Sequence, residues 1–188
     1  MTDNPKPALR RLFRERRQQF VAGLTTAERE ALYADLARNA APVVAGFTRI
    51  GSYAAVGEEI DPVQIEHGFS EVAYPRIDGA TISFHQAAWQ ELVPGPMNIP
   101  QPRPDAPRVV PDLLLVPLIA VTPGGVRLGQ GKGYYDRAIA DLRRTIPVRT
   151  VALAWDVQIA DALPADPWDM PVDFVATPTR LFDCARNR

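Results

Sequence analysis

The chain has 188 residues, of which 46% are apolar and 23% are charged, and its formal net charge is −1. A chain of this length is that of one ordinary domain, which buries roughly 70% of its unfolded surface without disulfides or metals. The apolar content excludes the collagenous and the disordered classes. A nucleic-acid-binding protein usually carries a strong basic excess, so the 21 basic and 22 acidic residues argue against nucleic acid as a partner.

Cysteine and histidine are scarce, which limits the chemistry that the chain can support. Cys184 has no second cysteine to pair with, and this fits a reducing compartment and excludes a cysteine-based metal site. His67 and His85 stand in no metal-ligand pattern. No apolar run approaches the ~18 residues of a membrane span, and no secretory signal opens the chain. We therefore predict a cytoplasmic protein with no membrane partner.

Two helices are predicted in the first 45 residues. Pro7 suits a first helical turn, and apolar residues then recur at helical spacing. Thr25 and Glu28 have the spacing of a capping box, so a second helix is expected from there to about Ala45. Residues 1–20 also hold six cations, which are Lys6, Arg10, Arg11, Arg14, Arg16 and Arg17. For most of these arginines we expect a solvated face of the first helix.

Strand-like and helical patterns alternate after residue 46. The strand-like runs are Arg49–Val56, Glu71–Ile77, Thr81–Ala87, Leu113–Val121, Val148–Ala154 and Phe174–Thr177. Between them, Pro62–Phe69 and Tyr134–Arg144 have helical patterns. This alternation predicts one α/β domain, spanning residues 1–188, with a mostly parallel sheet.

Two of the central segments have a composition that restricts their structure. Residues 94–111 contain seven prolines, so we expect an ordered surface loop and neither a regular helix nor a central strand. The following run from Leu113 to Val121 is nearly continuously apolar and is interrupted by Pro117. Such a run is typical of a strand that is covered on both faces.

The segment from Gly124 to Arg137 carries the most information about chemistry. It connects the apolar run to a helix, and a glycine-rich turn in that place directs backbone N–H groups and the positive end of the helix toward an anion. Arg127 and Lys132 add positive charge. Asp136 lies in the first helical turn, where a carboxylate can cap the helix or hold a hard cation. The helix is expected to face the core with Tyr135, Ala138, Ile139 and Leu142.

Neither of the two common phosphate-binding motifs fits this segment. A Walker loop requires Gly five positions before the Gly-Lys pair and Ser or Thr after it, but Val126 and Gly133 occupy those places. The dinucleotide-binding pattern fails because the third glycine follows the second by two positions and not by three. The residues alone therefore leave two interpretations open, an ordinary loop and a phosphate cradle.

The run from Arg127 to Arg137 resembles the 5-formyltetrahydrofolate cyclo-ligase family, also called methenyltetrahydrofolate synthetase. Five further segments resemble elements of that family in the same order: Lys6-Pro7-Ala8-Leu9-Arg10, Gly57-Glu58-Glu59-Ile60-Asp61, Tyr74-Pro75-Arg76, Asn98-Ile99-Pro100-Gln101-Pro102 and Pro171-Val172-Asp173. The resemblance covers residues 6 to about 177. It implies a single three-layer α/β/α domain with a mostly parallel, mixed sheet, Rossmann-like and similar to the NagB/RpiA/CoA-transferase-like fold.

The resemblance also implies an ATP-dependent ring closure. 5-Formyltetrahydrofolate and ATP would give 5,10-methenyltetrahydrofolate, ADP and phosphate through a phosphorylated formyl (imidate) intermediate, with Mg²⁺ accompanying the nucleotide. The partners would be these two small molecules, and the protein is expected to be a monomer.

The family assigns roles to particular positions of this chain. Lys132 and Arg127 are the expected catalytic residues, and Asp136 and Asp173 the expected Mg²⁺ ligands. The expected ATP-binding residues are Lys6, Arg10, Arg127, Leu128, Gly129, Gln130, Gly131, Lys132, Gly133, Tyr134 and Tyr135. The expected folate-binding residues are Arg10, Ala54, Glu59, Gln130, Gly131, Lys132, Gly133 and Tyr134.

Three positions depart from what many family members carry. Val121-Thr122 replaces a Phe-Asp pair, Met97 replaces a Trp, and Ala54 replaces a larger apolar residue. These departures concern the affinity for folate more than the nucleotide site. They keep an alternative open, in which a diverged family member binds nucleotide or folate without closing the ring.

Overall fold

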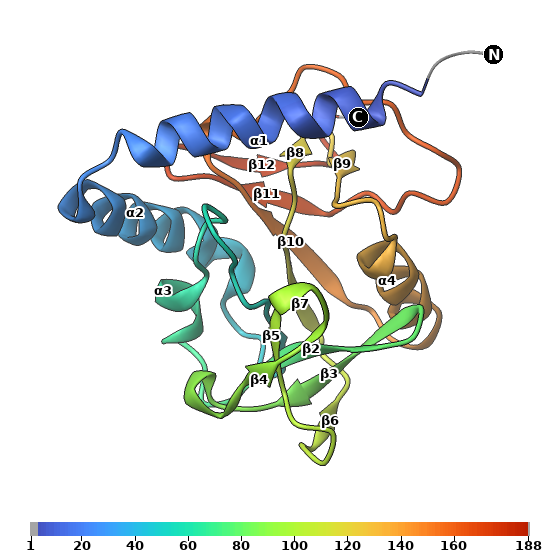
Figure 1. Ribbon diagram of the computed structural model, residues 1–188. Coiled ribbons are helices and arrows are strands. Elements are labelled where there is room, and N and C mark those ends of the chain that lie inside the picture. The colour runs from blue at the N-terminus through green and yellow to red at the C-terminus, as the bar shows by residue number, and fades with distance from the viewer. Residues whose placement is uncertain (1–3, 188) are drawn as a thin grey trace.

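The computed structural model describes residues 4–187 and is built around an eight-stranded mixed sheet (Figure 1). The strand order is β12 (Leu181–Asp183), β11 (Phe174–Ala176), β10 (Arg149–Leu153), β7 (Leu113–Val116), β1 (Ile50–Gly51), β2 (Val72–Asp78), β3 (Thr81–Gln86) and β6 (Arg108–Val109). The five strands from β11 to β2 are mutually parallel, whereas β12, β3 and β6 pair antiparallel with their neighbours. The predicted mostly parallel sheet is confirmed.

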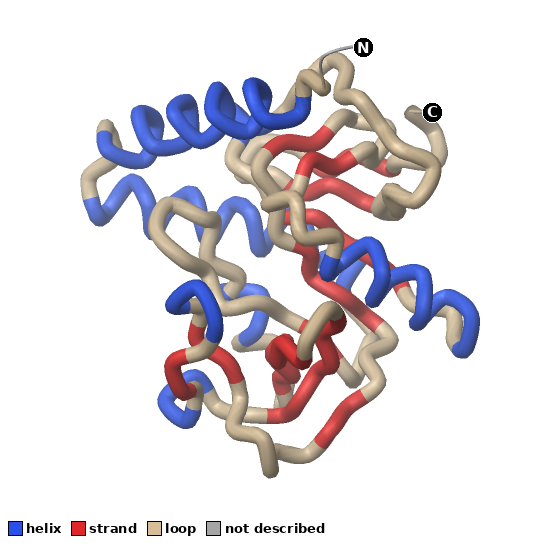
Figure 2. Tube along the Cα trace, turned by 45° about the vertical axis from the view of Figure 1, so that its right-hand side comes forward, coloured by secondary structure: helices blue, strands red, loops and turns tan. Residues whose placement is uncertain are grey.

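Four α-helices accompany the sheet: α1 (Lys6–Ala22), α2 (Thr26–Val44), α3 (Val63–Glu66) and α4 (Tyr134–Thr145). The apolar side chains of α2 and α3 cover one face of the sheet, and those of α4 cover the other. Figure 2 shows the strands between α2 and α4. This is the predicted three-layer α/β/α arrangement. None of the described helices is long and apolar enough to cross a membrane.

Strand β7 lies at the centre of this arrangement. Its four residues have no exposed surface, because Leu113 and Leu115 face the α2 side while Leu114 and Val116 face the α4 side. Burial on both faces explains the continuous apolar run, since no residue of such a strand faces water.

The apolar run does not continue as one strand beyond Pro117. The chain leaves the sheet there, and β8 (Ala120–Val121) pairs with β9 (Arg127–Leu128) in a separate antiparallel hairpin. The prediction of a single strand to Val121 was therefore wrong, because proline cannot donate to the ladder of a central strand. The hairpin that results carries the glycine-rich segment away from the sheet.

Helix α1 packs on this hairpin with its first half and on the main core with its second half. Leu9 and Phe13 contact a small cluster that includes Ile119 and Leu128 of the hairpin region. Phe20 packs against Trp155, with ring centroids 5.5 Å apart. Both contacts fix the rotation of α1 about its axis, and with it the direction of its cations.

Several predicted elements are shorter than expected. The run Arg49–Val56 forms a strand only at Ile50–Gly51, and Pro62–Phe69 forms a single helical turn, α3. The proline-rich segment 94–111 was predicted as a loop, but it contains the helical turn η2 (Pro96–Asn98), the strand β5 (Pro100–Gln101) and β6. Strand β5 pairs with β4 (Val93–Pro94) outside the main sheet, and β6 lies at the edge of that sheet, where proline neighbours are tolerated.

The capping box at the start of α2 is confirmed and gives a test of local stability. The Thr25 hydroxyl accepts a hydrogen bond from the Glu28 backbone N–H (3.3 Å), and the Glu28 carboxylate accepts one from the Thr25 N–H (2.8 Å). Thr25→Ala should lower the free energy of unfolding by about 1 kcal/mol, because the cap is lost. Urea denaturation measures this. Thr26→Ala, one position into the helix, is the control and should change stability by less than about 0.5 kcal/mol; equal losses in both variants would contradict the role of the cap.

Candidate functional site

The glycine-rich loop joins β9 to α4 and is shaped for close approach by a ligand. Gly131 and Gly133 have φ angles of 97° and 66°, in the left-handed region that favours glycine. No side chain caps α4, because the N-cap position is Gly133. The first N–H groups of a helix lack intrahelical partners, so the N-terminus of α4 presents donors and partial positive charge to an anion.

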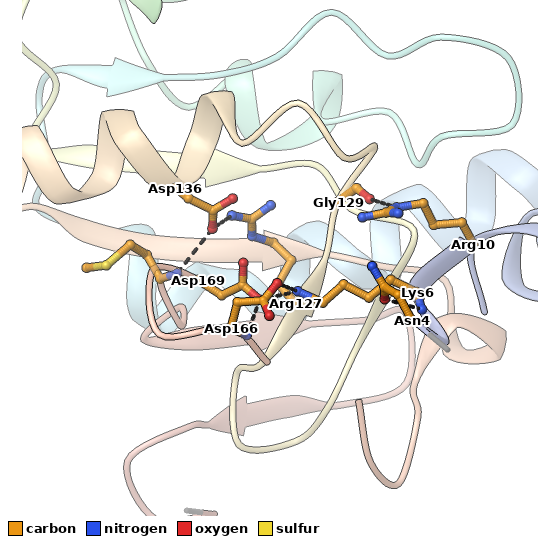
Figure 3. Close-up of polar contacts among 9 residues, drawn as sticks. Asn4, Lys6, Arg10, Arg127, Gly129, Asp136, Asp166 and Asp169 are labelled. Atoms are coloured by element: carbon orange, nitrogen blue, oxygen red, sulfur yellow. Dashed lines mark hydrogen bonds and ion pairs between the residues drawn. The ribbon is translucent and has the colours of Figure 1, made fainter. Parts of the chain in front are cut away.

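Arg10 joins helix α1 to this loop. Its Nε donates a hydrogen bond to the Gly129 carbonyl oxygen at 2.8 Å (Figure 3). A Cβ atom added at Gly131 would lie 3.2 Å from the Arg10 Cζ atom. A side chain at position 131 would therefore press on the guanidinium, so this glycine is required both by its φ angle and by the space that Arg10 takes.

Lys6 lies at the start of α1 and is buried, with 10% of its side chain exposed. Its Nζ contacts a carboxylate oxygen of Asp166 and one of Asp169, each at 2.6 Å. Burial alone would lower the pKa of Lys6, but hydrogen bonds and charge from the two aspartates outweigh burial and raise the pKa. Lys6 is therefore a fixed ammonium group and not a frayed residue of the chain end.

Arg127 and Asp136 form a buried ion pair beside the loop. The Arg127 Nη2 lies 2.7 Å from the Asp136 Oδ1, and 3% of the arginine side chain is exposed. The same Oδ1 accepts a hydrogen bond from the Met170 N–H at 3.1 Å. Burial lowers the pKa of Arg127, while the charge of Asp136 opposes that shift. Figure 3 shows Arg127 between Asp136 on one side and Lys6, with its partners Asp166 and Asp169, on the other.

The expected folate residue Glu59 meets the loop through Gln130. Glu59 Oε1 accepts a hydrogen bond from the Gln130 side-chain amide at 3.4 Å, and Oε2 accepts one from the Val56 N–H at 3.1 Å. Burial raises the pKa of Glu59 against the lowering effect of these bonds and of the nearby Arg17 charge. Ala54, also expected on the folate side, is buried.

The two tyrosines at the start of α4 point in different directions. The Tyr134 hydroxyl donates to the Gly79 carbonyl oxygen at 3.4 Å, and the Arg137 guanidinium lies 5.6 Å from the centre of its ring. The Tyr135 hydroxyl is buried and has no hydrogen-bond partner among the described residues. Burial raises its pKa, as does the charge of Glu59. The Tyr135 hydroxyl is therefore a buried, neutral group that is close enough to Glu59 for that charge to act on it.

The structure brings most of the expected site residues together around the loop. Asp173 instead contacts Arg143 and Thr150. Both carboxylate oxygens of Asp173 are used: Oδ1 contacts Arg143 at 2.8 Å, and Oδ2 accepts from the backbone and the hydroxyl of Thr150, each at 2.8 Å. Within residues 4–187, no group of three or more His, Cys, Asp or Glu side chains is placed to hold a metal ion. Lys132 lies exposed on the loop.

A cleft elsewhere on the molecule contains none of the expected site residues. It has a volume of about 780 Å³ and is lined by α3 and the turn η1 (Trp89–Glu91). Glu66 and Tyr74 on its wall are joined by a hydrogen bond of 2.8 Å. These groups already pair with each other, so the cleft is not assigned to the chemistry of the loop.

Four residues of the site were not predicted from the sequence. Asp166 and Asp169 hold Lys6, Arg14 donates to the Gln130 side chain, and Arg17 lies 3.9 Å from Glu59. The aspartates give no local signal, because they stand about 160 positions from Lys6. Arg17 does give a local signal, because positions 6, 10, 13 and 17 share one face of a helix and position 13 is an apolar phenylalanine. For Arg17, the prediction of a solvated face was wrong, since the residue is 6% exposed.

The fold and the loop define a three-layer α/β protein with a glycine-rich turn at the start of an uncapped helix. Residues 2–178 match the 5-formyltetrahydrofolate cyclo-ligase family. The chain belongs to this family.

Named relatives and solved structures agree with that membership. The 5-formyltetrahydrofolate cyclo-ligase of Escherichia coli K12 is 32% identical over 116 residues, which are 60% of this chain and 63% of that protein. The enzyme of Mycolicibacterium smegmatis is 41% identical over 69 residues, 37% of this chain and 34% of that protein. These matches thus span less than two thirds of either relative.

Two solved structures have the same fold. The 5,10-methenyltetrahydrofolate synthetase of Aquifex aeolicus, solved by NMR, superposes with a TM-score of 0.78 and 28% identity over 96% of this chain and 93% of that chain. The synthetase of Mycoplasma pneumoniae superposes with a TM-score of 0.70 over 92% of this chain and 98% of that chain; at 23% identity it supports the fold alone.

The contacts of Lys6 give a test of stability against pH. Burial works to raise the pKa of Asp169, but the Asp166 N–H and the Lys6 ammonium outweigh it and lower the pKa below 3.8. The stabilisation is therefore complete above pH 3.8 and is lost as the pH falls through the lower pKa of the folded state. Asp169→Asn should cost about 1–3 kcal/mol at pH 7, and the difference from the wild type should shrink below pH 3.8. Urea denaturation from pH 3 to pH 8 measures it.

The control for this experiment is Asp161→Asn, which changes an exposed aspartate of the preceding loop. It should leave the stability nearly unchanged at every pH. A deficit of Asp169→Asn that stayed constant down to pH 3 would show that the charge of Asp169 is not the source of its contribution.

Proposed function

We propose that this chain is a 5-formyltetrahydrofolate cyclo-ligase that uses ATP to close 5-formyltetrahydrofolate to 5,10-methenyltetrahydrofolate. One observation carries the proposal: Lys6, Arg10 and Arg127 converge beside a glycine loop that opens an uncapped helix. Cations and backbone N–H groups together are what a polyphosphate requires. The names of the relatives supply the substrate class.

The proposed reaction transfers a phosphoryl group and then closes a ring. The formyl oxygen attacks the γ-phosphorus of ATP, the bond from that phosphorus to ADP breaks, and a phosphorylated imidate forms on N5. N10 then attacks the activated carbon, the carbon–oxygen bond breaks, and phosphate leaves while N10 loses its proton. The demand on the protein is alignment and neutralisation of charge.

Each cation has a place in this scheme. Arg10 and Arg127 lie on the two sides of the loop, where they would hold the phosphates in line with the formyl oxygen. Lys132 is exposed on the loop itself and free to follow the transferred phosphoryl group. Leu128, by contrast, is buried in the core and would contribute through its backbone. Glu59, on the other side of Gln130, would accept the N–H donors of the pterin ring.

We also propose that Mg²⁺ accompanies ATP, since it neutralises phosphate charge and prefers carboxylate and phosphate oxygens. Asp136 fits this role, because among the described residues both of its hydrogen bonds, from Arg127 and from the Met170 N–H, use Oδ1 and leave Oδ2 for a cation. Asp173 fits less well, because it would have to exchange a contact with Thr150 or Arg143. Asp136 is therefore the main protein ligand in this proposal.

The test is appearance of the methenyl chromophore from 5-formyltetrahydrofolate and MgATP. We expect turnover by the wild type and a loss of at least about 100-fold in Lys132→Ala, because an interaction made in the transition state is removed. The thermal midpoint should stay the same, since an exposed loop cation contributes little to stability. Arg144→Ala, which removes an exposed cation at the far end of α4, is the matched control and should turn over normally. Binding of both ligands without product would instead support the diverged-binder alternative.

A second experiment tests the metal. Asp136→Asn should raise the Mg²⁺ concentration for half-maximal turnover by about tenfold, because a neutral amide holds the cation less tightly than a carboxylate does. Turnover is measured against Mg²⁺ at saturating ATP. Asp141→Asn, an exposed position on the same helix, should leave the requirement unchanged; an unchanged requirement in Asp136→Asn would remove this residue from the metal site.

The cytoplasmic location and the monomeric state remain parts of this proposal. The single cysteine fits a reducing compartment, and the monomeric state is what the family resemblance implies.

A further inference from the structure

Arg17 is a buried cation for which the proposed reaction has so far no use. It lies on α1, and 8% of its side chain is exposed. Its Nε and Nη1 atoms have no hydrogen-bond partner among the described residues. Buried arginine nitrogens without partners are costly, so the position of Arg17 calls for an explanation beyond packing.

The neighbour that Arg17 faces is Glu59. The Arg17 Nη1 lies 3.9 Å from the Glu59 Oε1, which is too long for a hydrogen bond but close enough for a strong charge interaction. The carboxylate is oriented by other groups, because Oε2 accepts from the Val56 N–H and Oε1 accepts from Gln130. The side chain of Glu59 remains 14% exposed, so a ligand can reach it.

The other groups around Glu59 do not supply positive charge directly. Glu58 is adjacent and repels a carboxylate. The hydroxyls of Tyr53 and Tyr135 stay neutral, because burial and the charge of Glu59 both raise the pKa of each. Arg14 reaches Glu59 only through Gln130. Arg17 is thus the cation that acts on this carboxylate.

We propose that Arg17 is a positioning residue of the folate subsite, which keeps Glu59 ionised so that its carboxylate accepts two N–H donors of the bound ring. The inference rests on the proposed function. An aminopyrimidinone ring presents adjacent N–H groups, and an ionised carboxylate has lone pairs for two parallel hydrogen bonds besides those it already makes. A protonated Glu59 would instead present a donor to a donor and lose one of these bonds.

The consequence is a specific dependence on pH. Burial raises the pKa of Glu59, and the charge of Arg17 opposes this rise. Removing that charge moves the protonation of Glu59 to higher pH, so folate affinity is lost at a higher pH than in the wild type. At a pH well above the Glu59 pKa of both proteins, Glu59 is ionised in the wild type and in the variant without the Arg17 charge. The folate affinities of the two proteins should converge there. A purely structural role of Arg17 would weaken binding equally at every pH.

The experiment measures binding of 5-formyltetrahydrofolate alone, without ATP, by calorimetry between pH 5.5 and pH 8.5. The Glu59 carboxyl carbon is followed in parallel by NMR to obtain its pKa. In Arg17→Met the pKa of Glu59 should rise by about one pH unit, and so should the pH below which folate affinity falls (the acid limb of the binding curve). At the lowest pH values this is about a tenfold loss of folate affinity relative to the wild type. Arg17→Lys should restore most of the shift, and affinity for ATP should change less than about twofold.

Two control variants accompany this experiment. Arg11→Met removes an exposed cation of the same helix and should move neither quantity. Glu59→Gln should bind weakly without an acid limb, and adding Arg17→Met to it should change the pH dependence no further.

The outcomes separate this inference from the proposed function. An unmoved pKa of Glu59 in Arg17→Met, or an equal loss of affinity at all pH values, overturns the role of Arg17. A moved pKa in a protein that binds no folate leaves the Arg17–Glu59 coupling intact and overturns the assignment of the folate subsite. If Arg17→Met does not fold, Arg17→Gln decides: it keeps a polar side chain without the charge, and the absence of any upward shift in the pKa of Glu59 overturns the proposal.

Discussion

The contact of Phe13 with the β8–β9 hairpin determines where the charged groups of the site lie. Phe13 is 4% exposed and packs with Ile119 and Leu128, and burial of a side chain of this size contributes roughly 1.5–3 kcal/mol. Lys6, Arg10 and Arg17 share its helical face. Together with the packing of Phe20 against Trp155, this contact turns three cations inward, toward the loop and Glu59, where solvation alone would turn them outward.

Buried cations need counter-charges, and the chain supplies them from distant segments for Lys6 and Arg17 and from the neighbouring helix start for Arg127. Asp166 and Asp169 face Lys6, Asp136 faces Arg127, and Glu59 faces Arg17. A polyphosphate that binds here must compete with these carboxylates for the same cations. The free energy of binding is then the difference between the ion pairs that the cations form with the phosphates and those that they lose with the carboxylates. A metal ion that coordinates one of these carboxylates therefore changes the affinity for the polyphosphate.

Local patterns were sufficient for part of this structure. The capping box at Thr25, the inner face of α4 and the glycine loop each depend on residues within a few positions of one another, and the sequence displays them directly. The pairing of Lys6 with Asp166 depends on the folded path of 160 residues, so no local rule finds it. Arg17 was missed for another reason: arginines on a helix are usually solvated, although the helical spacing places Arg17 on the same face as the apolar Phe13.

The order of the strands explains why Glu59 and the loop meet at all. From β1 the chain continues to β2 on one side of the sheet, and from β7 it continues to β10 on the other, so the direction of winding reverses between β1 and β7. Ligands of open parallel sheets bind outside the carboxyl ends of the strands at such a reversal. The segments that leave these two strand ends carry Glu59 and, beyond the β8–β9 hairpin, Gln130, and a hydrogen bond between these two side chains joins the segments. Helix α1 crosses this edge with Arg17 directed at Glu59, so a residue outside both segments acts on the group that the topology places there.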